Sequence, residues 1–154
     1  MTNWQRIWDS RTFIAVVHPL GWLWASPLTL TGLIVGLCTL PFGARLQRTK
    51  SALVFHRFPF GPGGAITLGN VILHTGDSLD ERTRTYACAA YGGDEHVCLG
   101  DHERAHVHQT MMLGPFFPLL YFACGGVSVR NRFEQAADHY AKTGQGWWPW
   151  PRPL

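Results

Sequence analysis

The feature that most constrains the fold is a long segment without charged side chains between Arg11 and Arg45. Its residues 13–40 are dominated by Leu, Ile, Val, Phe and Trp. A helix needs about 20 such residues to cross the roughly 30 Å hydrocarbon core of a bilayer, so this segment is long enough to span a membrane once. Four tryptophans lie where an interfacial aromatic belt is expected: Trp4, Trp8, Trp22 and Trp24. We therefore predict an N-terminal tail and membrane anchor helix at residues 1–45, with a buried core helix as the alternative.

Composition restricts the partners of the chain. Of its 154 residues, 15% are charged and 13% are aromatic, an unusual balance for a freely soluble protein of this length. A net charge of +3 and only two lysines, Lys50 and Lys142, exclude the electrostatic footprint of a nucleic-acid binder. Membrane lipid and the partners of a larger membrane protein complex are the expected contacts. More basic residues follow the apolar segment than precede it, which favours the cytoplasmic side for the C-terminal part.

The segment after the anchor has the pattern of an α+β domain at residues 51–154. The ranges 51–58 and 65–74 are rich in β-branched and aromatic residues and are separated by a Pro/Gly turn, which predicts an antiparallel pair. Within the second range, Gly69-Asn70 marks either a bulge or a hairpin turn. The sequence from Ser78 to Glu81 has the form of a capping box and predicts a short helix towards Tyr91.

Two cysteines of this region leave an alternative open. Cys88 and Cys98 flank a Gly-containing loop that a disulfide would close in an oxidising compartment, whereas two free thiols are expected elsewhere.

The strongest functional signal is the spacing His-Glu-x-x-His at His102, Glu103 and His106. Residues four apart lie on one face of an α-helix, so both imidazoles can point at one metal ion, with Glu103 beside the open coordination position. This pattern is typical of zinc hydrolases, in which the glutamate is the general base. We predict that the motif helix begins near residue 100 and ends near Leu113.

A catalytic zinc ion needs a third protein ligand. The apolar residues 111–129 are interrupted by Gly and Pro, and the continuous part is too short to span a bilayer, so the chain is expected to return to the same side. A second predicted helix at residues 131–143 then carries Glu134 and Asp138 on one face. We predict that Glu134 completes the Zn²⁺ site and that Asp138 accepts a hydrogen bond from a ligating histidine.

These residues resemble the gluzincin class of zinc metallopeptidases, in which the signature helix is followed by a helix with Glu-x-x-x-Asp. A longer set of segments is similar to small bacterial membrane-anchored proteins with a gluzincin-like core: Leu68-Gly69-Asn70-Val71, His102-Glu103-Arg104-Ala105-His106-Val107, Leu113-Gly114-Pro115-Phe116, Asn131-Arg132-Phe133-Glu134 and Trp147-Trp148-Pro149-Trp150. The resemblance implies a single-pass protein of the bacterial inner membrane. It also implies the same ligands, Glu103 as general base, and a peptide or protein substrate bound along the strand at residues 65–74.

Two features depart from the family pattern. The charged residues Asp101 and Arg104 flank and interrupt the motif, and no position identifies the oxyanion-stabilising residue. The candidates for that role are His139, Tyr140, Tyr121 and His96. The sequence therefore predicts a membrane-associated zinc metallopeptidase, with two alternatives: a non-catalytic zinc-binding protein, or a small structural subunit of a larger membrane protein complex.

Overall fold

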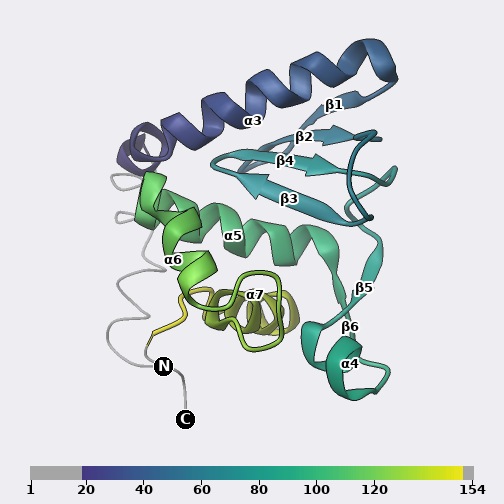
Figure 1. The fold of residues 1–154 in the computed structure, drawn as a ribbon, viewed down its shortest axis with the longest axis vertical. Helices are drawn as coiled ribbons and strands as arrows, with labels where there is room; N and C mark the ends of the chain where they lie inside the picture. The colour runs from purple at the N-terminus through teal and green to yellow at the C-terminus, as the bar shows by residue number, and fades with distance from the viewer. Residues whose placement is uncertain (1–18, 151–154) are drawn as a thin grey trace.

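Helices and strands are stacked in layers in the computed structural model, which describes residues 19–150 (Figure 1). Helix α3 covers one face of a four-stranded sheet, α5 covers the other, and α7 packs on the far side of α5 (Figure 1). A helical stretch at residues 19–24 precedes α3. The helices are α3 (Ser26–Thr39), η1 (Leu40–Phe42), α4 (Tyr86–Tyr91), α5 (Leu99–Leu113), η2 (Gly114–Phe116), α6 (Phe117–Ala123) and α7 (Arg132–Thr143). The strands are β1 (Arg45–Arg48), β2 (Leu53–His56), β3 (Ala65–Leu68), β4 (Val71–His74), β5 (Arg82–Arg84) and β6 (His96–Cys98).

The larger sheet has the order β1-β2-β4-β3, and β5 and β6 form a separate antiparallel pair. The predicted antiparallel pairing of 51–58 with 65–74 is wrong, because β2 runs parallel to β4, with Val54 opposite Ile72. The antiparallel hairpin is instead β3 with β4, and Gly69-Asn70 forms its turn. The positive φ of Gly69 (65°) suits such a turn, and its lack of a side chain lets Thr29 of α3 approach closely.

The two central strands are buried on both faces, as is typical of strands covered on each side by helices. Because successive side chains point to opposite faces, Val54 packs in a cluster with Val107 and Met111 of α5. Its neighbour Phe55 packs on the opposite side, in a cluster that includes Leu33 of α3. The sheet thereby fixes the position of α5, the helix that carries the motif.

The predicted membrane-spanning anchor is wrong. Within residues 19–150 no helix combines the length and the apolar character needed to cross a bilayer. The apolar segment is divided by a turn at Ala25, and the 14 residues of α3 extend about 21 Å, short of the roughly 30 Å required. Helix α3 instead packs on the sheet: a Cβ on Gly36 would lie 2.3 Å from the Phe55 ring. Residues 1–18, with Trp4, Trp8 and the first part of the predicted anchor, lie outside the described residues.

The capping-box prediction at residues 78–81 is also wrong. Ser78 Oγ accepts a hydrogen bond from the Asp80 amide in a local turn, and the chain then enters β5. The short helix begins later, at Tyr86, where the Thr85 side chain accepts from the Cys88 amide at 3.2 Å. Cys88 and Cys98 are free thiols in the structure.

The C-terminal part covers the α5–α7 pair. Helix α6 is a short surface helix that turns Phe117 inward, and it returns the chain to α7. Beyond α7, the ring of Trp150 packs edge-on against Phe133 at 5.4 Å between centroids, and the Trp147 carbonyl accepts from the buried Gln109. The Trp-rich segment is therefore packed over the domain as far as residue 150.

Candidate metal centre

Helices α5 and α7 bring the three predicted ligands together. The predicted bounds of both helices agree with the structure to within two residues. Asn131 caps α7 by accepting from the Phe133 amide at 3.0 Å, and Gly144 ends it with a positive φ of 71°. These local signals place Glu134 in the first turn of α7, facing His102 and His106 on α5.

Three ligand atoms converge at the centre of this interface. His102 Nε2 lies 3.2 Å from His106 Nε2, and Glu134 Oε2 lies 3.0 Å from the first and 3.3 Å from the second. Tetrahedral zinc with bonds of about 2.0–2.1 Å separates its ligand atoms by roughly 3.3 Å. The three side chains are at most 6% exposed. This buried group could therefore hold a metal ion with little rearrangement.

The far side of each histidine ring is held by another side chain. His102 Nδ1 lies 3.0 Å from Asp138 Oδ1, as predicted for a carboxylate that fixes tautomer and basicity. His106 Nδ1 lies 2.8 Å from Oε1 of Gln109, a residue that the sequence analysis missed. Gln109 is fully buried and donates to the backbone carbonyls of Phe133 and Trp147. Its position three residues after His106 on the same helix was the available signal.

Glu103 lies on the side of α5 that faces the sheet edge. Its Oε2 accepts a hydrogen bond of 2.6 Å from the hydroxyl of Thr67 on β3. The carboxylate is 5% exposed, and its charge contributes to the raised pKa of both His102 and Tyr86. The edge strand β3 therefore positions the predicted general base, a role of Thr67 that no sequence signal indicated.

Two tyrosines complete the surroundings of the ligands. The Tyr121 hydroxyl donates to Glu134 Oε1, the oxygen that faces away from the histidines. The Tyr86 ring stacks on His102 with 6.0 Å between centroids, and its amide donates to Asp138 Oδ2 at 2.9 Å. Tyr86 was not predicted, because it comes from α4, which contacts the site only through the tertiary fold.

Buried charge governs protonation at this interface. Burial opposes a charged His102, but its hydrogen bonds to Asp138 and Glu134 outweigh burial and raise its pKa to about 10. Burial likewise acts to raise the pKa of Glu134, yet the hydrogen bonds from His102 and His106 hold it well below its usual range. Burial and the neighbouring carboxylates raise the pKa of both Tyr86 and Tyr121, so each hydroxyl keeps its proton.

The four candidates for an oxyanion-stabilising residue separate clearly. Only Tyr121 touches the site. Tyr140 packs against His108, while His96 lies beside Asp94 and His139 beside Gly146.

The departure at Arg104 also proves to be remote from the ligands. Its guanidinium pairs with Asp101 at 2.9 Å on the exposed side of α5. The charged residues that interrupt the motif therefore do not disturb the group of ligands.

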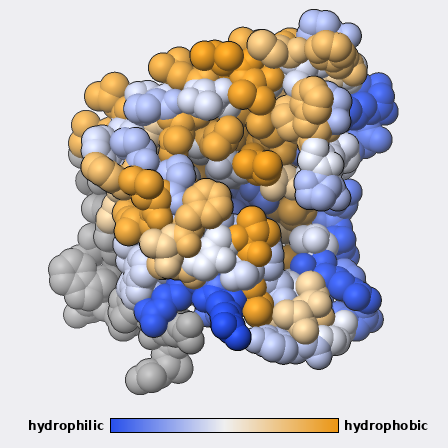
Figure 2. Space-filling view, viewed as in Figure 1, coloured by the Kyte–Doolittle hydropathy of each residue, from blue (hydrophilic) through white to orange (hydrophobic). Residues whose placement is uncertain are grey.

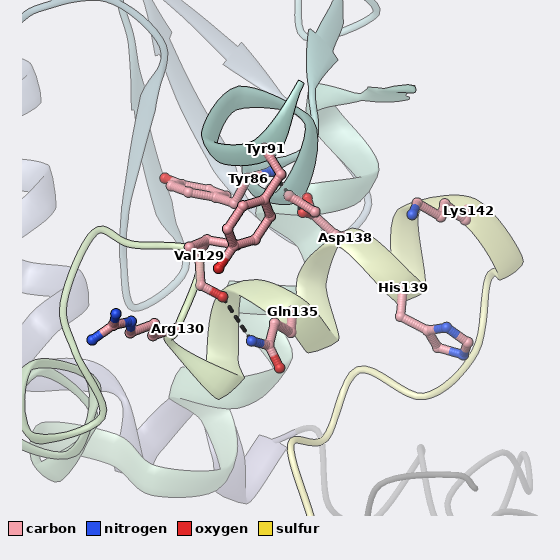
Figure 3. Close-up of a pocket in the computed structure, with 9 residues that line it drawn as sticks. Tyr86, Tyr91, Val129, Arg130, Gln135, Asp138, His139 and Lys142 are labelled. Carbon is pink, nitrogen blue, oxygen red and sulfur yellow. Dashed lines mark hydrogen bonds between the residues drawn. The ribbon is translucent and has the colours of Figure 1, made fainter. Parts of the chain in front are cut away.

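A pocket of about 420 Å³ borders the site through Tyr86 and Asp138 (Figure 3). Figure 3 shows Tyr86, Tyr91 and Asp138 on one side, with Gln135 donating to the Val129 carbonyl at 2.6 Å on another. His102, His106 and Glu134 do not line this pocket.

Comparison of the chain with known proteins yields no assignment. No family model, no curated protein and no solved structure matches it.

Proposed function

We propose that the protein is a zinc-dependent metallopeptidase of gluzincin-like type, with His102, His106 and Glu134 as ligands and Glu103 as the general base. The observation that carries the proposal is the triangle of Nε2, Nε2 and Oε2 atoms with sides of 3.0–3.3 Å. Two nitrogen ligands and one carboxylate are a common protein donor set of catalytic zinc.

Each residue of the site would have a separate role in peptide hydrolysis. Zinc, when bound, would act as a Lewis acid that lowers the pKa of water and polarises the scissile carbonyl. Glu103 would take the proton of the attacking water and deliver it to the leaving amine. Thr67 would hold the Glu103 carboxylate in place through its hydrogen bond. Tyr86, whose raised pKa keeps its hydroxyl protonated, would be a donor for the carbonyl oxygen.

The position of β3 supports a peptide as substrate. It is an edge strand of the sheet, and β4 is its only partner among the described strands. An extended peptide added to a free strand edge gains backbone hydrogen bonds without a requirement for sequence. Since Thr67 of β3 contacts Glu103, a peptide on this edge would run past the general base.

The burial of the ligands favours a second candidate, a protein that binds zinc for stability without turnover. His102, His106 and Glu134 are 5%, 6% and 2% exposed, and the Tyr121 hydroxyl occupies the second oxygen of Glu134. Ligands buried this deeply suit a zinc ion that holds α5 and α7 together, whereas a catalytic zinc ion keeps one position open to water.

One experiment distinguishes the two candidates. The full chain, Glu103→Gln and His106→Ala are purified, and zinc stoichiometry and cleavage of a peptide mixture are measured. A peptidase predicts that Glu103→Gln keeps zinc and loses cleavage by about 10²-fold or more, because the general base is absent. His106→Ala should lose both zinc and cleavage.

Glu95→Gln is the matched control, because Glu95 is half exposed and pairs with Lys142 outside the site. It should keep both zinc and cleavage. Zinc without cleavage in the unmodified chain would establish the structural role, and absence of bound zinc would refute both candidates.

A further inference from the structure

Helix α3 is apolar on its outer side as well as on the side that contacts the sheet. Leu30, Ile34 and Leu37 recur at the spacing of one helical face, and their side chains are 57%, 63% and 50% exposed. A surface helix of a globular protein normally presents polar residues to water on this side. The outer face of α3 therefore has the composition of a contact surface.

A second exposed apolar segment adjoins the first. Leu119 and Phe122 of α6 are each 69% exposed. The rings of Trp24, just before α3, and Phe116, just before α6, are 6.0 Å apart and connect the two segments. Figure 2 shows hydrophobic side chains over α3 and on towards α6, with strongly hydrophilic residues along the right edge and the lower part of this view. We call the exposed side chains of α3 and α6 the apolar face.

Charge is distributed unevenly around the apolar face. No Asp or Glu occurs in residues 19–76, and none occurs between Glu103 and Glu134, the stretch that contains α6. Each apolar segment is followed by exposed basic residues: Arg45, Arg48 and Lys50 after α3, and Arg130 and Arg132 after α6. Of these basic residues, Arg45 interacts with Asp77, which itself pairs with Arg57. A surface that combines apolar side chains with an excess of basic residues is complementary to anionic lipid.

We propose that the apolar face docks on the surface of an anionic lipid membrane, with α3 lying along the interface on top of the sheet. Partial insertion of an apolar helix face beneath the headgroups requires neither a spanning length nor a loss of the packing against the sheet. A second copy of the chain fits less well, because a symmetric contact would bring together two clusters that each carry an excess of basic residues. Gly32 and Gly36, which favour close helix pairing, already contact Val71 and Phe55 of the sheet. This inference is independent of the proposed peptidase activity.

The test measures flotation of the full chain with vesicles of phosphatidylcholine, with and without phosphatidylglycerol. Ile34→Ser combined with Leu30→Ser should weaken binding about tenfold or more, since two inserted apolar side chains are lost. Arg45→Gln combined with Arg48→Gln should weaken binding about tenfold on the anionic vesicles only. Added salt should reduce binding of the unmodified chain to those vesicles.

The matched control is Tyr91→Ser, which removes a large side chain, 77% exposed, from α4, at the opposite end of the molecule from α3 (Figure 1). It should bind vesicles like the unmodified chain. Circular dichroism of each variant establishes that it is folded. Failure of the unmodified chain to float overturns the proposal, as does flotation that Ile34→Ser and Leu30→Ser leave unchanged. A dimer that these substitutions dissociate, without vesicle binding, would assign the face to a second copy.

Discussion

Replacing Asp138 by Asn tests whether the metal centre depends on the orientation of His102. Asp138 accepts two hydrogen bonds, from His102 Nδ1 at 3.0 Å and from the Tyr86 amide at 2.9 Å. An asparagine has a single acceptor oxygen, so one of the two donors loses its partner. If the amide nitrogen turns towards His102, it donates to Nδ1 and shifts the ring proton to Nε2, the atom required by the metal.

The magnitude follows from the type of contact. Loss of such an outer carboxylate typically weakens metal affinity about 10- to 100-fold. That range corresponds to roughly 1.4–2.7 kcal/mol of binding free energy. We expect the zinc dissociation constant of Asp138→Asn to rise by this factor, while Glu134 and His106 still bind the ion.

The assay is competition for zinc against a chromophoric chelator at fixed pH, with the fold of each variant checked by circular dichroism. Glu81→Gln is the matched control, because the Glu81 carboxylate likewise pairs with a buried histidine, with Oε1 2.7 Å from His74 Nε2, but His74 is not a proposed ligand. It should leave zinc affinity unchanged. A zinc affinity of folded Asp138→Asn within about twofold of the unmodified chain would refute the reasoning, since the hydrogen bond from His102 to Asp138 would then have no effect on metal binding.

Three further predictions concern the stability of the fold. Gly36→Ala should lower the free energy of unfolding by about 1–3 kcal/mol, and with it the urea midpoint, because its Cβ would overlap the Phe55 ring. The exposed Thr31→Ala is the control, and an unchanged midpoint would contradict the packing of α3 on the sheet. Burial and the neighbouring His74 lower the pKa of His56 below 6.5, so the unfolded chain takes up the proton more readily than the folded one. This histidine should therefore lower the free energy of unfolding as the pH falls below about 6.5. Unfolding measured at pH values above and below about 6.5 should show the loss, and His56→Gln should remove it. Gln109→Ala should lower the free energy of unfolding by about 1–3 kcal/mol and also weaken zinc binding, because two buried carbonyls and Nδ1 of His106 lose their partner. Denaturation measures the first effect and the chelator assay the second. A loss of stability without a loss of zinc affinity would contradict the role of Gln109 in orienting His106.

The parts of the fold that the sequence predicted are those fixed by local signals. The helix with His102 and His106 begins and ends close to its predicted bounds, and so does α7, because caps and glycines operate over a few residues. The spacing of four between Glu134 and Asp138 placed them on one face of a helix, and the structure turns that face towards His102.

Apart from the local capping-box signal at residues 78–81, the incorrect predictions concern contacts between distant segments. β3 follows β2 in the chain but lies at the edge of the sheet, beyond β4, so β4 pairs with β2 in the parallel direction. The alternation of side chains within a strand does not encode this order. The glycines of α3 are compatible both with helix packing in a bilayer and with packing on a sheet. The Phe55 ring that fills the space beside Gly36 belongs to β2, a contact that the sequence of α3 alone does not indicate. Tyr86 and Thr67 likewise reach the site from elements without any motif.

The charges buried between α5 and α7 give a physical reason for a cation at this interface. Glu103, Glu134 and Asp138 are 5%, 2% and 7% exposed, and among residues 19–150 the imidazoles of His102 and His106 lie beside them. Burial of several carboxylates is costly unless cationic groups compensate them, and a protonated His102 compensates one. A divalent ion bound by His102, His106 and Glu134 would compensate two and would release the proton from His102, so zinc affinity should rise with pH. Turnover would additionally require water to reach the side of the ion that faces Glu103 and the β3 edge.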